Sequence, residues 1–556
     1  MNLFSRTFQW FVCLAVLLLM NTNCKKSDGG SEPQSLTLSF TVNGSYNGTL
    51  SYNGLNNNPT IRFTFSSPID QATIPAGITL KQGGTSVNYT QQLENNNTIL
   101  QIKPAAPLSG FSSYNLTVTE QLRSRNGGRL LNPVTINLST GIDSSRKFPQ
   151  ISDEELLTKV QQQTFKYFWD FAHPTSFLAR ERSNGNNNVV TSGGSGFGVM
   201  AIVTGVERGF VTRTAAVTRL RTMVGFLKNT AVKVKGAFSH WIDGTTGAIV
   251  PFSANDNGAD LVETSLLMQG LLTARQYFNG AGAEETALRA DINAIWNGID
   301  WDWFRRGGQN TLYWHYSDNL GWAMNLPIRG WNECLITYVL AASAPTNPIP
   351  KIVYDNGWAA NGAIRNGNNY YGYTLPLGPD RGGPLFLSHY SFLGINPNGL
   401  VDAYANYNTQ VRNHALINYE YCKQNPRNYY GYSDSVWGLT ASDIPNGYTA
   451  SSPTNDVGVI APTAALSSFP YTPQQSLAAL RFFYYVLGDR LWKEYGFIDA
   501  FSLKDQWFAG SHLAIDQGPI IIMIENYRTG LLWNLFTSCP EIKTGMRNLG
   551  FTAPYL

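Results

Sequence analysis

The sequence predicts a small all-β sandwich followed by a large all-α domain. Three observations lead to this expectation. The chain has 556 residues, which is too long for one core of ordinary size. Apolar residues alternate with a period of two over residues 35–140, and from residue 150 onward they recur with a helical period. We interpret residues 141–149, between the two patterns, as a linker.

The first 24 residues have the pattern of an export signal. Arg6 precedes an apolar run at residues 11–20, and Cys24 follows this run. Cys24 and the polar residues 25–34 resemble the lipid-modified cysteine and flexible tether of a bacterial lipoprotein. We therefore expect an exported protein that reaches the outer membrane only through a lipid on Cys24, because no later apolar run could span a bilayer. A plain secreted protein is the alternative.

Residues 35–140 are predicted to form an antiparallel sandwich. Short β-type runs alternate in polarity and are separated by Asn-Gly and Gly-Gly turns. These runs include residues 36–42, 60–65, 98–102 and 114–118. Together with residues 65–70 and 104–110, they resemble bacterial Ig-like domains. Such a module implies a spacer or a packing partner, and a sugar-binding role of its own is the alternative.

The remainder, residues 150–556, is predicted to be helical. Ser152 and Glu155 form a capping box that opens the first helix. Helical stretches are expected at residues 152–172, 195–208, 213–229, 260–278, 285–304, 330–343, 383–393, 400–423, 473–487 and 517–538. Many are apolar over most of their circumference, which favours a closed ring of helical hairpins with a cleft at one end. An irregular helical bundle is the alternative.

Composition narrows the class of ligand. Charged residues make up only 14% of the chain and aromatic residues 13%, which suits neutral polar ligands such as sugars or, alternatively, a well-filled core. A net charge of +3 without a long basic run gives no electrostatic footprint for nucleic acid. Cys334, Cys422 and Cys539 show neither a disulfide framework nor a zinc motif, so we expect buried thiols. The glycine-rich residues 193–198 are interpreted as a tight loop before a helix, because no strand that a nucleotide site requires precedes them.

Three carboxylates gather at the start of one predicted helix. Asp260 and Glu263 share a helix face, and Asp256 lies in the loop before them. Carboxylates so close repel one another, so one of them is expected to have a raised pKa. The alternative is a structural capping box formed by Asp260 and Glu263.

Glu333 is a second candidate. It lies near the start of an otherwise apolar helix, between Trp331 and Cys334. A carboxyl group in such surroundings loses hydration and its pKa rises, so that it can hold a proton near neutral pH as a general acid must. An ion pair with Arg329 is the alternative.

Asp516 is a third candidate. Because it precedes Pro519 and an apolar run, we interpret it as an N-cap. Backbone N–H groups and the helix dipole would then keep its carboxylate ionised, as a general base requires. The alternative is a residue that only caps. Trp314 and His315, beside Asp318, suit stacking on a sugar ring and contact with its hydroxyl groups, and core packing is the alternative.

Eight motifs taken together resemble the bacterial glucoamylase-like domain of glycoside hydrolase family 144. They occupy residues 168–171, 179–183, 191–198, 240–244, 260–264, 329–333, 437–440 and 516–520. The resemblance implies an (α/α)6 barrel that hydrolyses β-1,2-glucan with inversion, usually by endo cleavage that releases sophorose-type oligosaccharides. Some relatives instead remove sophorose from a chain end, and the sequence does not separate the two modes.

The resemblance also assigns roles to residues. Glu333 would be the general acid and Asp516 the base, with Asp256, Asp260 and Glu263 as essential cleft carboxylates or part of a base relay. Substrate contacts are expected from Trp241, Asp243, Trp314, His315, Arg329, Trp331 and Trp437. We expect a monomer that needs neither a metal nor another cofactor. A polysaccharide lyase and a non-catalytic surface glycan-binding lipoprotein are the alternatives.

Overall fold

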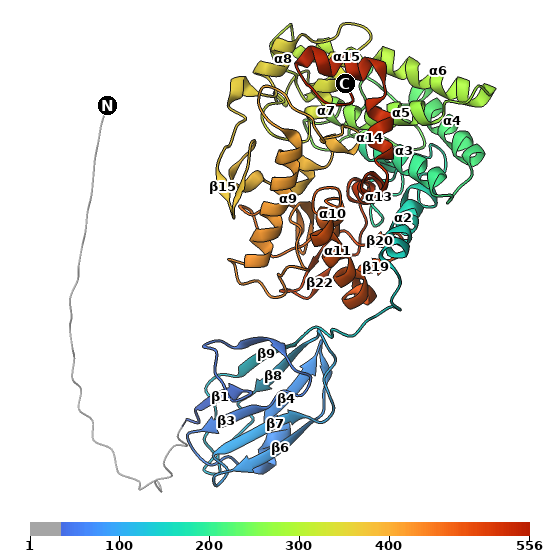
Figure 1. The fold of residues 1–556 in the computed structure, drawn as a ribbon. Coiled ribbons are helices and arrows are strands. Elements are labelled where there is room, and N and C mark those ends of the chain that lie inside the picture. The colour runs from blue at the N-terminus through green and yellow to red at the C-terminus, as the bar shows by residue number, and fades with distance from the viewer. Residues whose placement is uncertain (1–34) are drawn as a thin grey trace, which may run out of the picture. The chain divides into compact units, whose positions relative to one another are not determined.

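The computed structural model describes residues 35–556 (Figure 1). The predicted export signal, Cys24 and the tether at residues 25–34 lie outside the described residues. The chain divides into two compact units between Gly141 and Ile142. Among the described residues, no helix is both long and apolar enough to cross a bilayer.

The first unit is a sandwich of two sheets. One sheet has the order β1 (Leu38–Val42), β3 (Ile61–Phe65), β7 (Ile99–Pro104) and β6 (Tyr89–Glu94). The other has the order β2 (Ser51–Leu55), β9 (Val134–Thr140), β8 (Ser113–Val118), β4 (Ile78–Gln82) and β5 (Thr85–Ser86), in which β2 and β9 are parallel. The inward-facing residues of both sheets, such as Phe63, Ile102, Leu116 and Ile136, form one buried core. The alternation that predicts the sandwich is therefore the alternation between core and solvent.

The second unit is largely helical. Its α-helices are α2 (Asp153–Trp169), α3 (Ser192–Glu207), α4 (Arg213–Asn229), α5 (Leu261–Tyr277), α6 (Ala283–Gly298), α7 (Leu335–Ser343), α8 (Lys351–Asn356), α9 (Tyr407–Gln424), α10 (Pro462–Leu466), α11 (Pro473–Arg481), α12 (Gly488–Leu491), α13 (Ala514–Arg528), α14 (Leu531–Thr537) and α15 (Pro540–Leu549). The predicted capping box is confirmed, because Ser152 and Glu155 each accept from the other's backbone N–H at the start of α2. The three cysteines of this unit are buried and unpaired, as predicted.

Helices α3, α5, α7 and α13 are buried over most of their length and pack against one another. α3 lies between α5 and α13, and α5 also contacts α7. Glycines permit this close packing. A Cβ atom on Gly196 would overlap the carbonyl oxygen of Leu266, and one on Gly270 would overlap that of Gly196. The backbones of α3 and α5 therefore meet almost directly.

The structure corrects the interpretation of residues 193–198. They are not a loop, because α3 begins at Ser192 and includes them. Glycine disfavours a helix by about 1 kcal/mol per residue relative to alanine, but burial against two neighbouring helices outweighs this cost here. A Cβ atom on Gly194 would lie 2.7 Å from that of Ala514 in α13, so this glycine too serves close packing.

Other predicted helices are shorter or broken. Residues 383–393 form two 3₁₀ turns, η5 (Leu385–Ser388) and η6 (Ser391–Leu393). The stretch predicted at 517–538 is divided into α13 and α14 by Gly530, whose φ is 70°. The π-helical turn Phe482–Val486 follows α11. Between the helices lie short strands, of which five matter for the site: β11 (Trp241–Asp243), β13 (Ala259–Asp260), β14 (His315–Tyr316), β17 (Ala441–Ile444) and β18 (Gly447–Ala450). The strands β13 and β14 pair with each other, and β17 and β18 form a hairpin.

Candidate active site

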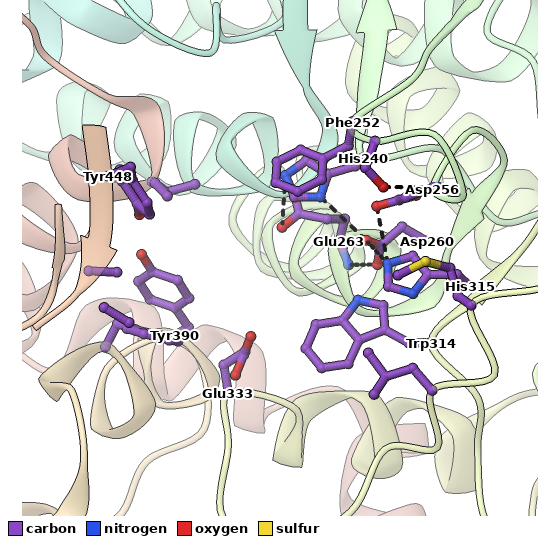
Figure 2. Close-up of a pocket in the computed structure, with 17 residues that line it drawn as sticks. His240, Phe252, Asp256, Asp260, Glu263, Trp314, His315, Glu333, Tyr390 and Tyr448 are labelled. Carbon is purple, nitrogen blue, oxygen red and sulfur yellow. Dashed lines mark hydrogen bonds and ion pairs between the residues drawn. The ribbon is translucent and has the colours of Figure 1, made fainter. Parts of the chain in front are cut away.

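A cleft in the helical unit collects most of the predicted carboxylates. Its main cavity has a volume of about 360 Å³, and a second cavity of about 300 Å³ shares His240, Phe252, Tyr448 and Ile515 with it. Pockets of this size bind small ligands in many proteins. Asp256, Asp260, Glu263 and Glu333 all line the main cavity. Figure 2 shows Glu333, Tyr390 and Tyr448 across the open space from Glu263 and His240.

Asp260 is held in place by two local features. It is the N-cap of α5, where its Oδ1 accepts from the backbone N–H groups of Val262 and Glu263 at 2.9 Å each. It also pairs with His315 in the two-stranded sheet of β13 and β14. The cap and the strand pairing leave Oδ2 of Asp260 facing two imidazole rings.

Asp256, Asp260, His240 and His315 form what we term the charged cluster. His315 Nε2 lies 3.2 Å from Asp256 Oδ2 and 3.3 Å from Asp260 Oδ2, and His240 Nδ1 lies 3.4 Å from Asp260 Oδ2. Burial alone would lower the pKa of both imidazoles, but the neighbouring carboxylates outweigh it and raise each pKa to about 9. Burial likewise would raise the pKa of Asp260, yet the two histidines hold it well below its usual range.

The charged cluster contains the atoms that could hold a metal ion. Among the residues that the structure describes, His240, Asp256 and Asp260 place three possible ligand atoms within 4.8 Å of one another. With imidazole pKa values of about 9, protons occupy the nitrogen lone pairs at neutral pH. The cluster therefore presents N–H donors beside the ionised carboxylate of Asp260.

Glu263 does not complete the predicted capping box. Its Oε2 instead accepts from the backbone N–H of Gly193 at 2.8 Å and from the hydroxyl of Thr191 at 3.3 Å. Burial raises the pKa of Glu263 above its ordinary value. A Cβ atom on Gly193 would overlap Oε2, so the glycine leaves the room that this carboxyl group occupies. The prediction is thus correct for the cap at Asp260 and wrong for the box.

Glu333 faces the cavity from the turn just before α7. Burial raises its pKa to about 7, and the charges of Glu263 and Asp260 add to this effect. Glu333 forms no ion pair with Arg329, which is exposed and is absent from the cavity lining. The alternative of a buried ion pair is therefore wrong, and the predicted substrate contact of Arg329 stays a prediction.

Asp516 differs from the prediction in position and in charge. It lies inside the first turn of α13, whose N-cap is Leu513, because the backbone N–H of Ala514 finds its acceptor in the carbonyl of Glu181. Asp516 is 2% exposed and does not line the cavity, whereas its neighbour Ile515 does. Burial, together with Asp499, raises the pKa of Asp516 well above its usual range, so the predicted N-cap with an ionised carboxylate is wrong.

The predicted substrate-contact residues separate into two groups. Trp314 and His315 line the main cavity and Trp241 lines the second one. Asp243, Trp331 and Trp437 instead make contacts that stabilise the fold. Asp243 accepts from Thr245 and Thr246 in a turn, Trp331 packs on Trp358 and Phe392, and Trp437 is fully buried and donates to the carbonyl of Gln475.

Comparison with known proteins places this geometry in a family. The family described as "Putative glucoamylase" matches residues 325–540, and the bacterial Ig-like domain matches residues 36–140. An endo-β-1,2-glucanase from Chitinophaga pinensis, solved with sophorotriose and glucose, is 51% identical with a TM-score of 0.72 and covers 73% of this chain and 100% of its own. The chain belongs to the glucoamylase-like glycoside hydrolase family 144.

Two further relatives of this glucoamylase-like chain come from Parabacteroides distasonis. A solved β-1,2-glucanase is 38% identical with a TM-score of 0.70, covering 89% of this chain and 72% of its own. A curated exo-β-1,2-glucooligosaccharide sophorohydrolase acting at the non-reducing end is 45% identical over 427 residues, which are 73% of this chain. The match spans 59% of the length of that curated relative.

Four cavity-lining side chains of the glucoamylase-like domain were not among the residues predicted from the sequence. Phe252 stacks on His240 at a ring-centroid distance of 4.2 Å. Tyr390 lies between η5 and η6, and Tyr448 lies on the β17–β18 hairpin. The Asn446-Gly447 pair is a hairpin signal that could have located Tyr448. His240 is part of a family motif, but its contact with Asp260 depends on a fold that brings β11 to the start of α5.

Proposed function

We propose that this protein is an inverting glycoside hydrolase that cleaves β-1,2-glucan. The observation that carries the proposal is Glu333, a carboxyl group with a pKa of about 7 that faces a cleft of about 360 Å³. A general acid must hold a proton at the working pH and lie within reach of the leaving oxygen. The family relationship to two β-1,2-glucanases supports this choice of substrate.

Glu333 would donate its proton to the glycosidic oxygen while a base removes a proton from the attacking water on the opposite face of the sugar. Asp516 stays our candidate for the base, and because it does not line the cavity the proton of the attacking water would reach it through an intervening water. After burial, the charge of Asp516 is the largest influence that raises the pKa values of Tyr390 and Tyr448, which line the cleft. These tyrosines connect Asp516 electrostatically with the cavity.

The charged cluster and Glu263 would bind and orient the sugar. Protonated His240 and His315 offer N–H donors, and Asp256 and Asp260 offer acceptors, so the cluster matches the mixed donor and acceptor character of vicinal hydroxyl groups. Trp314 and Trp241 supply apolar faces for C–H surfaces of the pyranose rings. We expect each of the three carboxylates Asp256, Asp260 and Glu263 to be essential.

The position of the cut along the glucan is the finer part of the proposal. The curated relative that removes sophorose from the non-reducing end favours exo action for this chain. The Chitinophaga pinensis relative, whose own chain is covered completely, supports endo action. We place exo release of sophorose first and endo cleavage second.

We further propose that the helical unit closes into an (α/α)6 barrel. Support comes from neighbouring buried segments that follow one another around a ring: α3 contacts α5, α5 contacts α7, α7 contacts η6, and α10 contacts α13, which returns to α3. His389 next to η5 approaches Ser468 after α10 at 3.0 Å and joins the two halves. Export and a lipid anchor at Cys24 stay part of the proposal.

Incubation with linear β-1,2-, β-1,3-, β-1,4- and α-1,4-glucans tests this function, with products followed by chromatography over time. We expect products only from the β-1,2-glucan. Sophorose alone from the earliest times would support exo action, and a ladder of oligosaccharides would support endo action. Binding without any cleavage would overturn the proposal in favour of a glycan-binding protein.

A further inference from the structure

Two buried aspartates lie together behind the cleft wall. Asp499, between β20 (Gly496–Phe497) and β21 (Phe501–Ser502), is 1% exposed, and Asp516 is 2% exposed. Their carboxyl groups lie within hydrogen-bonding reach of each other. Oδ1 of Asp499 and Oδ2 of Asp516 are nevertheless buried oxygen atoms without a hydrogen-bond donor among the described residues. A buried polar atom without a partner is costly, so this arrangement needs an explanation.

The neighbouring groups do not supply the missing positive charge. Arg182 Nε donates to Glu181 at 2.9 Å, and Arg182 Nη1 donates to Asp443 at 3.1 Å. Ser511 also donates to the Asp443 carboxylate, at 2.5 Å. One guanidinium group is therefore already shared by two carboxylates before Asp499 and Asp516 are considered.

The backbone fixes the position of Asp499. Its Oδ2 accepts from the backbone N–H of Asp443 at 2.7 Å, at the start of the hairpin that carries Tyr448. This bond leaves Oδ1 as the oxygen that is free to meet Asp516. The other titratable groups whose charges interact with the pair are Asp443, Arg182, Tyr167, Tyr390 and Tyr448.

A shared proton resolves these observations. Two carboxylates in contact away from solvent cannot both be ionised, and one proton between them gives each orphaned oxygen a partner. We propose that Asp499 is a positioning residue that shares a single proton with Asp516, so that the pair acts as the base in its singly protonated form. This inference rests on the proposed function, in which Asp516 receives the proton of the attacking water.

The reaction balances with this pair. The water oxygen forms a bond to the anomeric carbon, the glycosidic C–O bond breaks, and Glu333 gives its proton to the departing oxygen. The proton released by the water passes to the unprotonated carboxylate of the pair, which then carries two protons. Return of one proton to Glu333 through solvent restores both groups. Burial raises the pKa of Asp499 to about 6, although the hydrogen bond with Asp516 lowers it, and this value is in keeping with a pair that holds a proton near neutral pH.

Asp499→Asn and Asp499→Ala test the proposal together, with Asp505→Asn on the exposed part of the neighbouring turn as the matched control. The amide introduced by Asp499→Asn offers a permanent N–H donor to Asp516 and imitates the protonated partner. We expect Asp499→Asn to keep the acidic limb of the kcat/KM profile close to that of the wild type. Asp499→Ala should move that limb upward by about one pH unit or more, because the buried carboxylate of Asp516 then ionises without the donor that a protonated partner supplies. Equal limbs in all variants would overturn the proposal.

Infrared difference spectroscopy adds a measurement that does not depend on activity. At pH 7 the wild type should show a protonated carboxyl C=O band that both Asp499→Asn and Asp516→Asn lack and that Asp505→Asn retains. Absence of this band would overturn the pair whatever the enzyme cleaves. If the band is present but Asp516→Asn stays fully active, the pair exists and the proposed base assignment fails instead, which removes the catalytic role of Asp499. Both measurements use the full chain, and the amide variants preserve side-chain shape if Asp499→Ala does not fold.

Discussion

Replacing Glu333 by glutamine removes one acidic proton while keeping the shape of the side chain. General acid catalysis contributes about 10²–10⁴-fold to rate, so we expect Glu333→Gln to lower kcat on β-1,2-glucan by about that factor. This loss corresponds to about 3–5 kcal/mol of transition-state stabilisation. KM and oligosaccharide binding should change little, because the new amide keeps a polar group at the same place in the cleft.

The pKa of Glu333 supplies the second part of this prediction. With a pKa of about 7, the group is about nine-tenths protonated at pH 6 and about one-tenth protonated at pH 8. The protonated form is the active one, so kcat/KM of the wild type should fall about tenfold per pH unit above pH 7. The Glu333→Gln variant should have no such alkaline limb.

Initial rates from pH 5 to pH 9 on β-1,2-glucan and on a β-sophoroside with an activated aryl leaving group provide the assay. An aryl leaving group departs without protonation, so the variant should recover most of its activity on that substrate. Glu494→Gln, at an exposed position away from the cleft, is the control and should behave as the wild type. A Glu333→Gln variant that keeps most of its rate on the glucan, or retains the alkaline limb, would refute the acid assignment.

Four further predictions follow from the structure. Ionising the buried Glu333 costs the folded state about 3 kcal/mol, so the stability that its proton provides is complete below pH 4.5 and is lost as the pH rises through 7. Thermal unfolding should therefore find Glu333→Gln more stable than the wild type at pH 8 but not at pH 4. Equal stability of the two proteins at pH 8 would contradict this prediction. Gly196→Ala should destabilise the protein by about 3 kcal/mol, because the new Cβ would overlap the carbonyl oxygen of Leu266. The control Gly225→Ala in α4, where a Cβ meets nothing within 4 Å, should be neutral or stabilising. Equal melting temperatures of the two variants would disprove the close packing of α3 on α5. Arg208→Ala should lower the free energy of unfolding by about 3–5 kcal/mol, because it leaves the fully buried carboxylate of Glu525 without its bidentate ion pair. A loss below about 1 kcal/mol in denaturant unfolding would show that this ion pair contributes little to stability. Trp314→Ala should raise KM on β-1,2-glucan by about tenfold or more while Trp437→Phe in the core leaves it unchanged, and an unchanged KM for Trp314→Ala would remove this residue from the binding surface.

Much of the fold follows from local patterns in the sequence. The helices α4 and α5 were predictable because apolar residues recur with a helical period and caps mark their starts, at Thr212 and Asp260. The residues 383–393 are mostly apolar and were predicted as a helix, but they form two 3₁₀ turns. Tertiary contacts that the sequence does not display, such as the hydroxyl of Tyr471 donating to the carbonyl of Ser388, accompany this irregular backbone.

Site residues were predictable where their spacing on one helix, or the apolar residues next to them in sequence, was enough to indicate their surroundings. The Asp256–Asp260–Glu263 spacing and the apolar surroundings of Glu333 locate four carboxylates that line the same cavity. Asp516 shows where such reasoning ends. The sequence suggests an N-cap, but a carbonyl from Glu181 serves the helix instead, and Asp499, from a separate loop, sets the charge of Asp516. Partners so distant in sequence become visible only when the fold brings them together.

The anomeric form of the first product tests most directly the claim that a protonated Glu333 and an opposing base act on the two faces of one linkage. Proton NMR during the first turnovers on β-1,2-glucan distinguishes the new reducing end before mutarotation. We expect the α-anomer to accumulate first, because water attacks from the side opposite the departing oxygen. Initial accumulation of the β-anomer would mean retention through a covalent intermediate and would contradict the roles of Glu333 as acid and of an opposing base.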